Sequence, residues 1–190
     1  GQFSSPWTDT EEGTDLGALI DDDPTTFWHS NWHDGAVAVH THYLQVALNE
    51  PAHELVRATV SRRQVSGNHV TLWSVYGSNE PDAEDEAWTK LAVLSTPYSG
   101  DYNEVVNTLA FDTKGFLHLR FYIDANSGGS GLGHMSEFQL YEVEANAESQ
   151  FAAIGQEAKN LSDVVLAQSL IPVADVTSED YAELQAAYNA

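Results

Sequence analysis

The 190-residue sequence has no cysteine and few basic residues, 7 against 29 acidic ones, so its formal net charge is −22. Without cysteine the chain cannot form a disulfide scaffold, a zinc–thiolate site or a cysteine nucleophile, although this does not exclude secretion. Nucleic acid and anionic membrane surfaces are unsuitable partners, because both are bound by clustered positive charge. No apolar run approaches the roughly 20 residues that cross a bilayer, so we expect no membrane insertion.

Two regions differ in composition. Residues 1–145 contain all 5 Trp and many short, partly alternating runs, such as 43–48, 55–60, 70–77, 116–123 and 138–143. In the run 116–123 Phe, His, Arg and Tyr alternate with Leu, Leu, Phe and Ile, which is the pattern of a half-buried strand. Turn residues separate these runs, so the region is predicted to be an all-β antiparallel sandwich.

Residues 146–190 are rich in Ala, Glu, Gln and Leu and contain no Trp. Apolar residues recur there at three- and four-residue steps over 147–169, which predicts a helix. Pro172 ends this pattern, and a second helix is predicted to begin near Ser178. We expect either a short α-helical C-terminal extension that packs on the sandwich or the start of a next module, with further domains in a longer protein.

The most informative loop is Asp21-Asp22-Asp23-Pro24, followed by Thr26. Three consecutive carboxylates repel one another, and a turn that wraps a cation turns this cost into a gain. Calcium takes 6–8 oxygens from carboxylates, carbonyls and hydroxyls, so Asp21, Asp23 and Thr26 are candidate ligands. The simpler alternative is a plain acidic turn.

A second loop, His29-Ser30-Asn31-Trp32-His33, suits a sugar, because an indole stacks on the apolar face of a pyranose while polar groups hold its hydroxyls. The histidines could instead be structural, and a weaker alternative is a zinc site drawn from His29, His33, His40 and His42. A third stretch contains Arg62 and Arg63, and a guanidinium suits forked hydrogen bonding to neighbouring hydroxyls. The alternative there is an arginine paired with a surface carboxylate.

Together these stretches resemble the coagulation factor 5/8 type C (discoidin) family, and within it the family 32 carbohydrate-binding modules of bacterial secreted proteins. The resemblance covers about residues 3–144. It rests on 18–28 with His29-Ser30-Asn31-Trp32, on 42–46, on Arg62-Arg63, on 75–79 and on 136–141. It implies a jelly-roll, galactose-binding-like β-sandwich with one structural calcium ion.

The resemblance implies a calcium site in which Asp21, Asp23 and Thr26 are joined by Glu137 from the last strand. Ala18 and Ser136 would contribute backbone carbonyls. The departure from the family pattern is Asp22, where a Gly is usual. If this position needs a positive φ, Asp tolerates it better than most residues.

For the sugar site the resemblance implies His29 with Trp32, Arg63 with Asn68, and an acidic residue, Glu12 or Glu11. Arg63 and Asn68 would bind adjacent hydroxyls, His29 an axial hydroxyl, and Trp32 would stack. The late loop 126–134 contains no aromatic residue, so a shallow, open site is expected.

The implied function is non-catalytic binding of a galactose-type or related glycan, which tethers a larger secreted or bacterial cell-surface protein to that glycan. The alternative is a discoidin-like adhesion domain that binds a protein or another surface ligand. Catalysis is not expected, because the chain has no Gly-x-Ser-x-Gly, His-Glu-x-x-His or phosphate-binding loop.

Overall fold

The structure is a computed structural model, and it describes residues 2–11, 15–33, 37–102 and 104–144. The strands are β1 (Gln2–Ser4), β2 (Trp28–His29), β3 (Tyr43–Ala47), β4 (Leu55–Ser61), β5 (Val70–Ser78), β6 (Thr89–Ser95), β7 (Val105–Asn107), β8 (His118–Asn126), β9 (His134–Met135) and β10 (Glu137–Val143). Two short 3-10 helices, η1 (Leu16–Ile20) and η2 (Asp85–Ala87), complete the elements. The predicted helical tail over 146–190 and its boundary lie outside the described residues.

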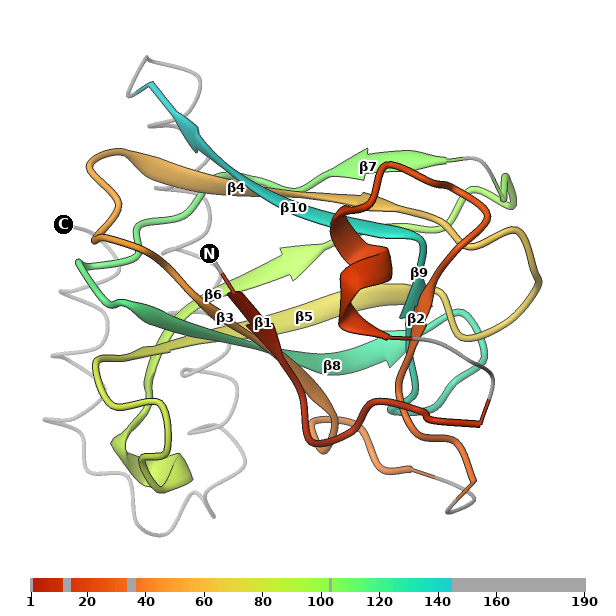
Figure 1. The fold of residues 1–190 in the computed structure, drawn as a ribbon, viewed down its shortest axis with the longest axis horizontal. Helices are drawn as coiled ribbons and strands as arrows, with labels where there is room; N and C mark the ends of the chain where they lie inside the picture. The colour runs from red at the N-terminus through yellow and green to blue at the C-terminus, as the bar shows by residue number, and fades with distance from the viewer. Residues whose placement is uncertain (1, 12–14, 34–36, 103, 145–190) are drawn as a thin grey trace, which may run out of the picture. The chain divides into compact units, whose positions relative to one another are not determined.

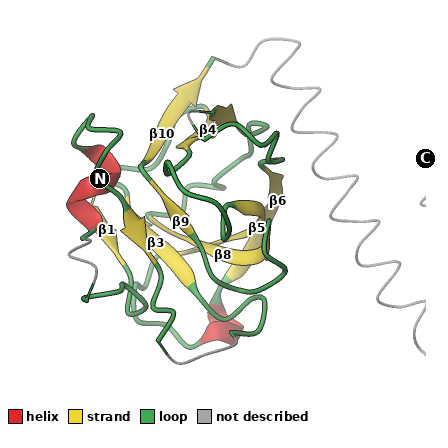
Figure 2. Cartoon of the chain, turned by 90° about the vertical axis from the view of Figure 1, so that its right-hand side faces the viewer, coloured by secondary structure: helices red, strands yellow, loops and turns green. Residues whose placement is uncertain are grey.

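The strands form a five-stranded sheet in the order β1-β3-β8-β5-β6 and a three-stranded sheet in the order β10-β4-β7. All ladders between these strands are antiparallel. Figure 1 shows the two sheets as layers, with the small β2–β9 ladder at one end, and Figure 2 looks onto that end. The predicted all-β sandwich is therefore confirmed.

Large apolar side chains from both sheets meet between the layers. Phe121 of β8 and Trp73 of β5 lie 5.0 Å and 5.8 Å, centroid to centroid, from the ring of Phe138 in β10. All three side chains are buried, and β4 alternates buried and half-buried positions as a strand with one face on the core should.

The run 116–123 was predicted to be a half-buried strand, and the structure corrects this. Phe121 faces the core as expected, but Arg120 and Tyr122 on the opposite face are buried as well. The segment around η2 covers them, since Asp85 bonds both side chains. A distant segment of chain therefore packs on the outer face of the five-stranded sheet.

Replacement of Phe121 by alanine should destabilise the domain by about 3–5 kcal/mol, because a ring at the contact between the sheets is lost and a cavity remains. Urea unfolding measures this change. Tyr141→Ala is a matched control, since that ring is exposed on the outer face of β10, and it should change stability by less than about 1 kcal/mol. Equal effects in the two variants would contradict the assignment of Phe121 to the core.

Candidate functional site

Three imidazoles gather at the β2–β9 end of the sandwich. His29 pairs with His134 in the ladder, and their ring centroids are 5.2 Å apart. His69, at the start of β5, lies 4.7 Å from His134. All three are buried. Residues from three distant parts of the sequence thus form one cluster.

Burial disfavours the charged form of two of these imidazoles. It lowers the pKa of His134 to about 2, with the neighbouring His29, His69 and Arg63 adding to the shift. Burial likewise lowers the pKa of His69. The Nδ1 atom of His29 donates to the carbonyl of Ser30 at 2.5 Å, so the Nε2 atom of the neutral ring is an acceptor. A sugar hydroxyl is a suitable donor to that atom.

Arg63 and Asn68 lie on the loop that joins β4 to β5, next to this cluster. The Arg63 guanidinium stacks over Phe27, 3.3 Å from the ring centroid. Asn68 has a left-handed backbone (φ 47°), and its carbonyl accepts from the His134 amide at 3.2 Å. Its side chain accepts from Asn126 at 3.1 Å, so the loop 126–134 is tied to the same place. The structure therefore brings Arg63 and Asn68 together with His29 around β9.

Trp32 lies on the loop that follows β2. Its side chain is 41% exposed and stacks on His33 at 4.1 Å. The His33 ring contacts Asp9 at 3.1 Å and Glu11 at 3.4 Å, and the amide of Asn31 donates to the carbonyl of Trp7 at 2.5 Å. Trp32 and Glu11 thus belong to one loop cluster at this end of the molecule. Glu12 lies outside the described residues.

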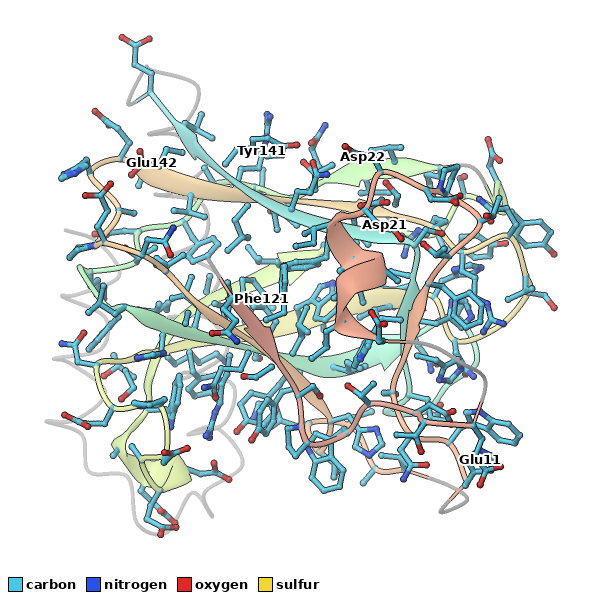
Figure 3. The ribbon with its side chains drawn as sticks, in the orientation of Figure 1. Glu11, Asp21, Asp22, Phe121, Tyr141 and Glu142 are labelled. Carbon is cyan, nitrogen blue, oxygen red and sulfur yellow. The ribbon has the colours of Figure 1, made fainter. Side chains whose placement is uncertain are left out.

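The backbone of the predicted calcium turn is left-handed at Asp22, the position where a Gly is usual in the family. Asp22 adopts φ 59°, so it tolerates the conformation for which the family uses glycine. Asp21 accepts from the amide of Asp23 at 2.9 Å and from the hydroxyl of Thr26. Asp23 instead caps the amide and hydroxyl of Thr25, and these bonds lower its pKa. Figure 3 places Asp21 and Asp22 beside β10.

Glu137 and Ser136 come from the start of β10. The Glu137 side chain is only 9% exposed, and neither carboxylate oxygen has a hydrogen-bond partner. Burial raises the pKa of Glu137, and the nearby charges of Asp21 and Asp22 raise it further. Ser136 donates to the carbonyl of Pro24 at 3.1 Å, which fixes β10 against the turn. A buried carboxylate next to a second carboxylate fits a hard cation.

The alternative zinc site is not supported. His33 contacts Asp9, His40 contacts Asp124, and His42 stacks on Trp7. Within the described parts of the chain no three His, Asp, Glu or Cys side chains are grouped to hold a metal ion. A cation at the turn would therefore need carbonyl and hydroxyl oxygens besides Asp21 and Glu137, including the carbonyl of the buried Ala18.

A profile of the F5/8 type C domain matches residues 2–138. The chain belongs to the F5/8 type C domain family. No curated protein matches it. Over the 2–11, 15–33, 37–102 and 104–144 ranges, this F5/8 type C domain has no helix long and apolar enough to cross a membrane.

The F5/8 type C domain is similar in fold to several solved carbohydrate-binding modules of Clostridium perfringens. One is the family 32 module of NanJ in complex with galactose, at 16% identity and a TM-score of 0.52, with 74% of this chain and 93% of that one covered. A second is the module CpGH89CBM32-5 in complex with GalNAc-β-1,3-galactose, at 14% identity, TM-score 0.56 and coverage of 74% and 94%. A third is CBM32-3 from a family 31 glycoside hydrolase, at 19% identity, TM-score 0.54 and coverage of 74% and 91%.

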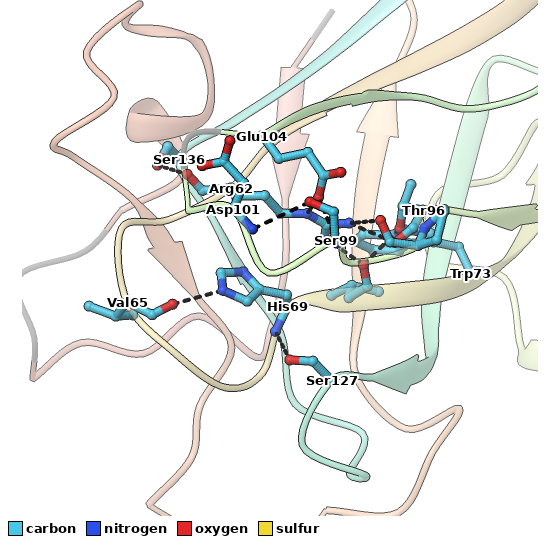
Figure 4. Close-up of polar contacts among 12 residues, drawn as sticks. Arg62, Val65, His69, Trp73, Thr96, Ser99, Asp101, Glu104, Ser127 and Ser136 are labelled. Atoms are coloured by element: carbon cyan, nitrogen blue, oxygen red, sulfur yellow. Dashed lines mark hydrogen bonds and ion pairs between the residues drawn. The ribbon is translucent and has the colours of Figure 1, made fainter.

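The residue types singled out Arg62 and Arg63 together, and the family resemblance implied only Arg63 for the sugar site; in this F5/8 type C domain the two residues differ. Arg62 is buried and donates to the carbonyls of Val70 at 2.7 Å and Thr96 at 2.6 Å (Figure 4). Its Nε atom lies 3.5 Å from Glu104. Arg62 therefore anchors loops, as the alternative of a carboxylate-paired arginine predicted, whereas Arg63 stays at the candidate site.

Sequence reasoning also missed an aromatic pair on the loop 96–104. Tyr98 packs on His69 at 4.3 Å, and Tyr102 stacks on Tyr98 at 6.4 Å with 40% of its surface exposed. The signal was two tyrosines in a stretch rich in turn residues, Pro97-Tyr98-Ser99-Gly100-Asp101-Tyr102. This loop supplies the aromatic side chains that the loop 126–134 lacks.

The buried, neutral His134 predicts a pH-dependent stability. Its folded pKa of about 2 lies below the ordinary 6.5, so protons bind the unfolded chain first and stability should fall as the pH drops below 6.5. Between pH 7 and pH 5 this one group should cost about 2 kcal/mol. Urea unfolding of the wild type and of His134→Gln at the two pH values measures it, and the variant should lose less. Parallel pH profiles in both proteins would contradict a buried, neutral imidazole.

Proposed function

We propose that this F5/8 type C domain is a non-catalytic carbohydrate-binding module for galactose-type or related glycans. The observation that carries the proposal is the convergence of His29, Arg63 and Asn68 around β9, with the exposed Trp32 on the next loop. These groups supply an acceptor, a forked donor, an amide and an apolar platform, which are the elements of a polar sugar site. Two of the similar solved modules hold galactose or a galactose-containing disaccharide.

The proposed binding mode divides the sugar among these groups. Arg63 is suited to donate to two adjacent hydroxyls, because stacking on Phe27 fixes the plane of its guanidinium. Asn68 would bind one of the same hydroxyls, and the buried His29 would accept a bond from a single axial hydroxyl through Nε2. Trp32 would stack on the apolar face of the ring. We further propose that the domain tethers a larger, secreted or surface-exposed bacterial protein to glycan, as the origin of one similar module in a glycoside hydrolase suggests.

Calcium is proposed as a structural partner of the domain. Asp21, Glu137 and the hydroxyl of Thr26 would hold it, with carbonyls of Ala18 and Ser136 and with Asp23 fixing the turn. The ion would neutralise the unpartnered Glu137 carboxylate and brace the turn against β10. This bracing would act on the sugar site indirectly, because the turn leads into Phe27 and His29.

The sugar site is tested by calorimetric titration with galactose, and we expect a dissociation constant near 1 mM, or about −4 kcal/mol. Arg63→Ala and Trp32→Ala should each weaken binding at least tenfold. The first loses the paired hydrogen bonds to adjacent hydroxyls, and the second loses the ring that stacks on the sugar. Arg57→Ala is a matched control, since Arg57 lies on β4 away from the loop end, and it should bind like the wild type. Unchanged binding in both site variants, with their melting temperatures intact, would refute the proposed site.

The calcium site is tested by thermal melting. Calcium at a hundredfold excess over its dissociation constant should raise the melting temperature by about 5–10 °C, and EDTA should reverse the rise. Glu137→Gln should remove this response and should itself melt higher than the wild type in EDTA, since it removes a buried, unpartnered charge. Glu50→Gln, an exposed control, should keep the response. A calcium response that survives in Glu137→Gln would exclude Glu137 as a ligand.

A further inference from the structure

A second pocket lies on the outer face of the five-stranded sheet. Its volume is about 470 Å³, which is within the usual range for ligand sites. Trp7, His40, Tyr43, Tyr122, Arg120 and the acidic residues of η2 line it. It shares no residue with the loop-end site of His29, Trp32, Arg63 and Asn68. The expected carbohydrate site does not account for this pocket.

His40 is held in a fixed position at the edge of this pocket. Its backbone is left-handed (φ 62°), a conformation that costs energy for a non-glycine residue. The His40 amide donates to the carbonyl of Ile123 at 2.8 Å, and its ring lies flat on Tyr122, with centroids 4.4 Å apart and planes within 14°. Backbone and ring are thus both positioned by β8.

A hydrogen bond to Asp124 sets the orientation of this imidazole. Nδ1 of His40 lies 2.6 Å from Oδ1 of Asp124, whose second oxygen accepts from the hydroxyl of Ser74. Because Asp124 accepts from Nδ1–H, the Nε2 atom of the neutral ring is left as an acceptor. The side chain is 43% exposed, so this acceptor is accessible to a ligand.

The protein holds the arginine in the pocket through each of its three nitrogen atoms. Arg120 donates through Nε to Gln45 at 2.8 Å, and through its two Nη atoms to Asp85 at 2.8 Å and to the carbonyl of Pro81 at 3.3 Å. Its guanidinium lies between Tyr43 and Trp88, 4.6 Å and 4.0 Å from their ring centroids. Arg120 is therefore fixed in position within the pocket.

The exposed charged groups of the pocket are carboxylates. Asp85 bonds Arg120 and Tyr122 through the same oxygen, Oδ1, and its side chain is 78% exposed. Glu84 and Glu86 beside it are exposed carboxylates. His40, Trp7 and Tyr43 line the same pocket. A ligand for this pocket must supply donors, tolerate aromatic contact and carry no negative charge.

We propose that this pocket is a second carbohydrate-binding site, specific for a pyranose that carries a protonated amine. The ring hydroxyls donate to His40 and Asp85, the ammonium group lies among the carboxylates of η2, and the apolar face of the sugar contacts Trp7 or Tyr43. The site is independent of the loop-end site, although the carbonyl of Trp7 also holds the amide of Asn31 next to Trp32.

The proposal is tested by ¹H–¹⁵N NMR titration of the whole chain with glucosamine, and in parallel with N-acetylglucosamine, glucuronic acid and lysine amide. Glucosamine should shift the amides of residues 40, 43 and 122 with a millimolar dissociation constant. N-acetylglucosamine should bind at least fivefold more weakly, and glucuronic acid should not bind. Equal binding of lysine amide would overturn the proposal, because the pocket would then recognise an ammonium group and not a sugar.

Variants separate this pocket from the loop-end site. His40→Gly keeps the positive φ without strain, so the backbone should be retained while Nε2 is lost. This variant and Glu84→Gln/Glu86→Gln should each weaken glucosamine binding at least fivefold and leave galactose binding unchanged. Arg63→Ala should weaken galactose binding and leave glucosamine binding unchanged. The control Glu50→Gln/Glu54→Gln makes the same charge change in another loop and should leave both affinities unchanged. Glucosamine affinity that is unchanged in a folded His40→Gly protein, or that falls in Arg63→Ala, would refute a separate site.

Discussion

The buried segment from His134 to Phe138 is the constraint on which the rest of the domain depends. All five residues are buried. His134 completes the imidazole cluster, Met135 and Phe138 enter the core, and Ser136 and Glu137 meet the turn at Asp21. One short stretch therefore fixes the proposed sugar site and the proposed calcium turn to the same core. A shift of one residue in register would turn each of these side chains to the opposite face, so sheet pairing and site geometry are specified together.

The loops of the site are held by buried polar groups more than by apolar packing. Arg62 joins its own loop to the start of β5, through the carbonyl of Val70, and to the loop after β6, through the carbonyls of Thr96 and Pro97. Burial lowers the pKa of this guanidinium, and Glu104 acts in the opposite direction. A buried charge with several directional hydrogen bonds adds little to the net stability of the domain, but it favours a single conformation of the loops. Rigid loops reduce the conformational entropy that is lost on binding, which matters for a weak, shallow site.

The sequence was sufficient to predict the sandwich and the main strands, because alternation such as that in 55–60 reports directly on which face is buried. It missed β6, where Leu91 to Leu94 form a continuous buried run without alternation. It also overestimated the exposure of β8, since the covering segment around η2 lies about 35 residues earlier in the sequence. Local periodicity contains no information on such long-range covering.

The candidate site was predictable only in part for the same reason. Spacing brought out His29, Arg63 and Asn68, which the fold does place together around β9. The residue types alone could not separate Arg62 from Arg63, because two adjacent residues at the end of a strand point to opposite sides and only the fold decides which side is the core. Nor could it show that His69 and Tyr98 lie beside His134, since these residues come from three distant parts of the sequence.

Charge gives the two faces different selectivities. Of 7 basic residues, Arg62 and Arg120 are already paired with Glu104 and Asp85, so few cations remain to attract an anionic ligand. At physiological ionic strength charges act over about 8 Å, so local groups decide the outcome. At the loop end, Arg63 lies beside imidazoles that burial keeps neutral, whereas the outer pocket is surrounded by carboxylates. The loop end therefore suits neutral sugars and the outer pocket cationic ones, and neither is built to attract the acidic sugars that a net charge of −22 already repels.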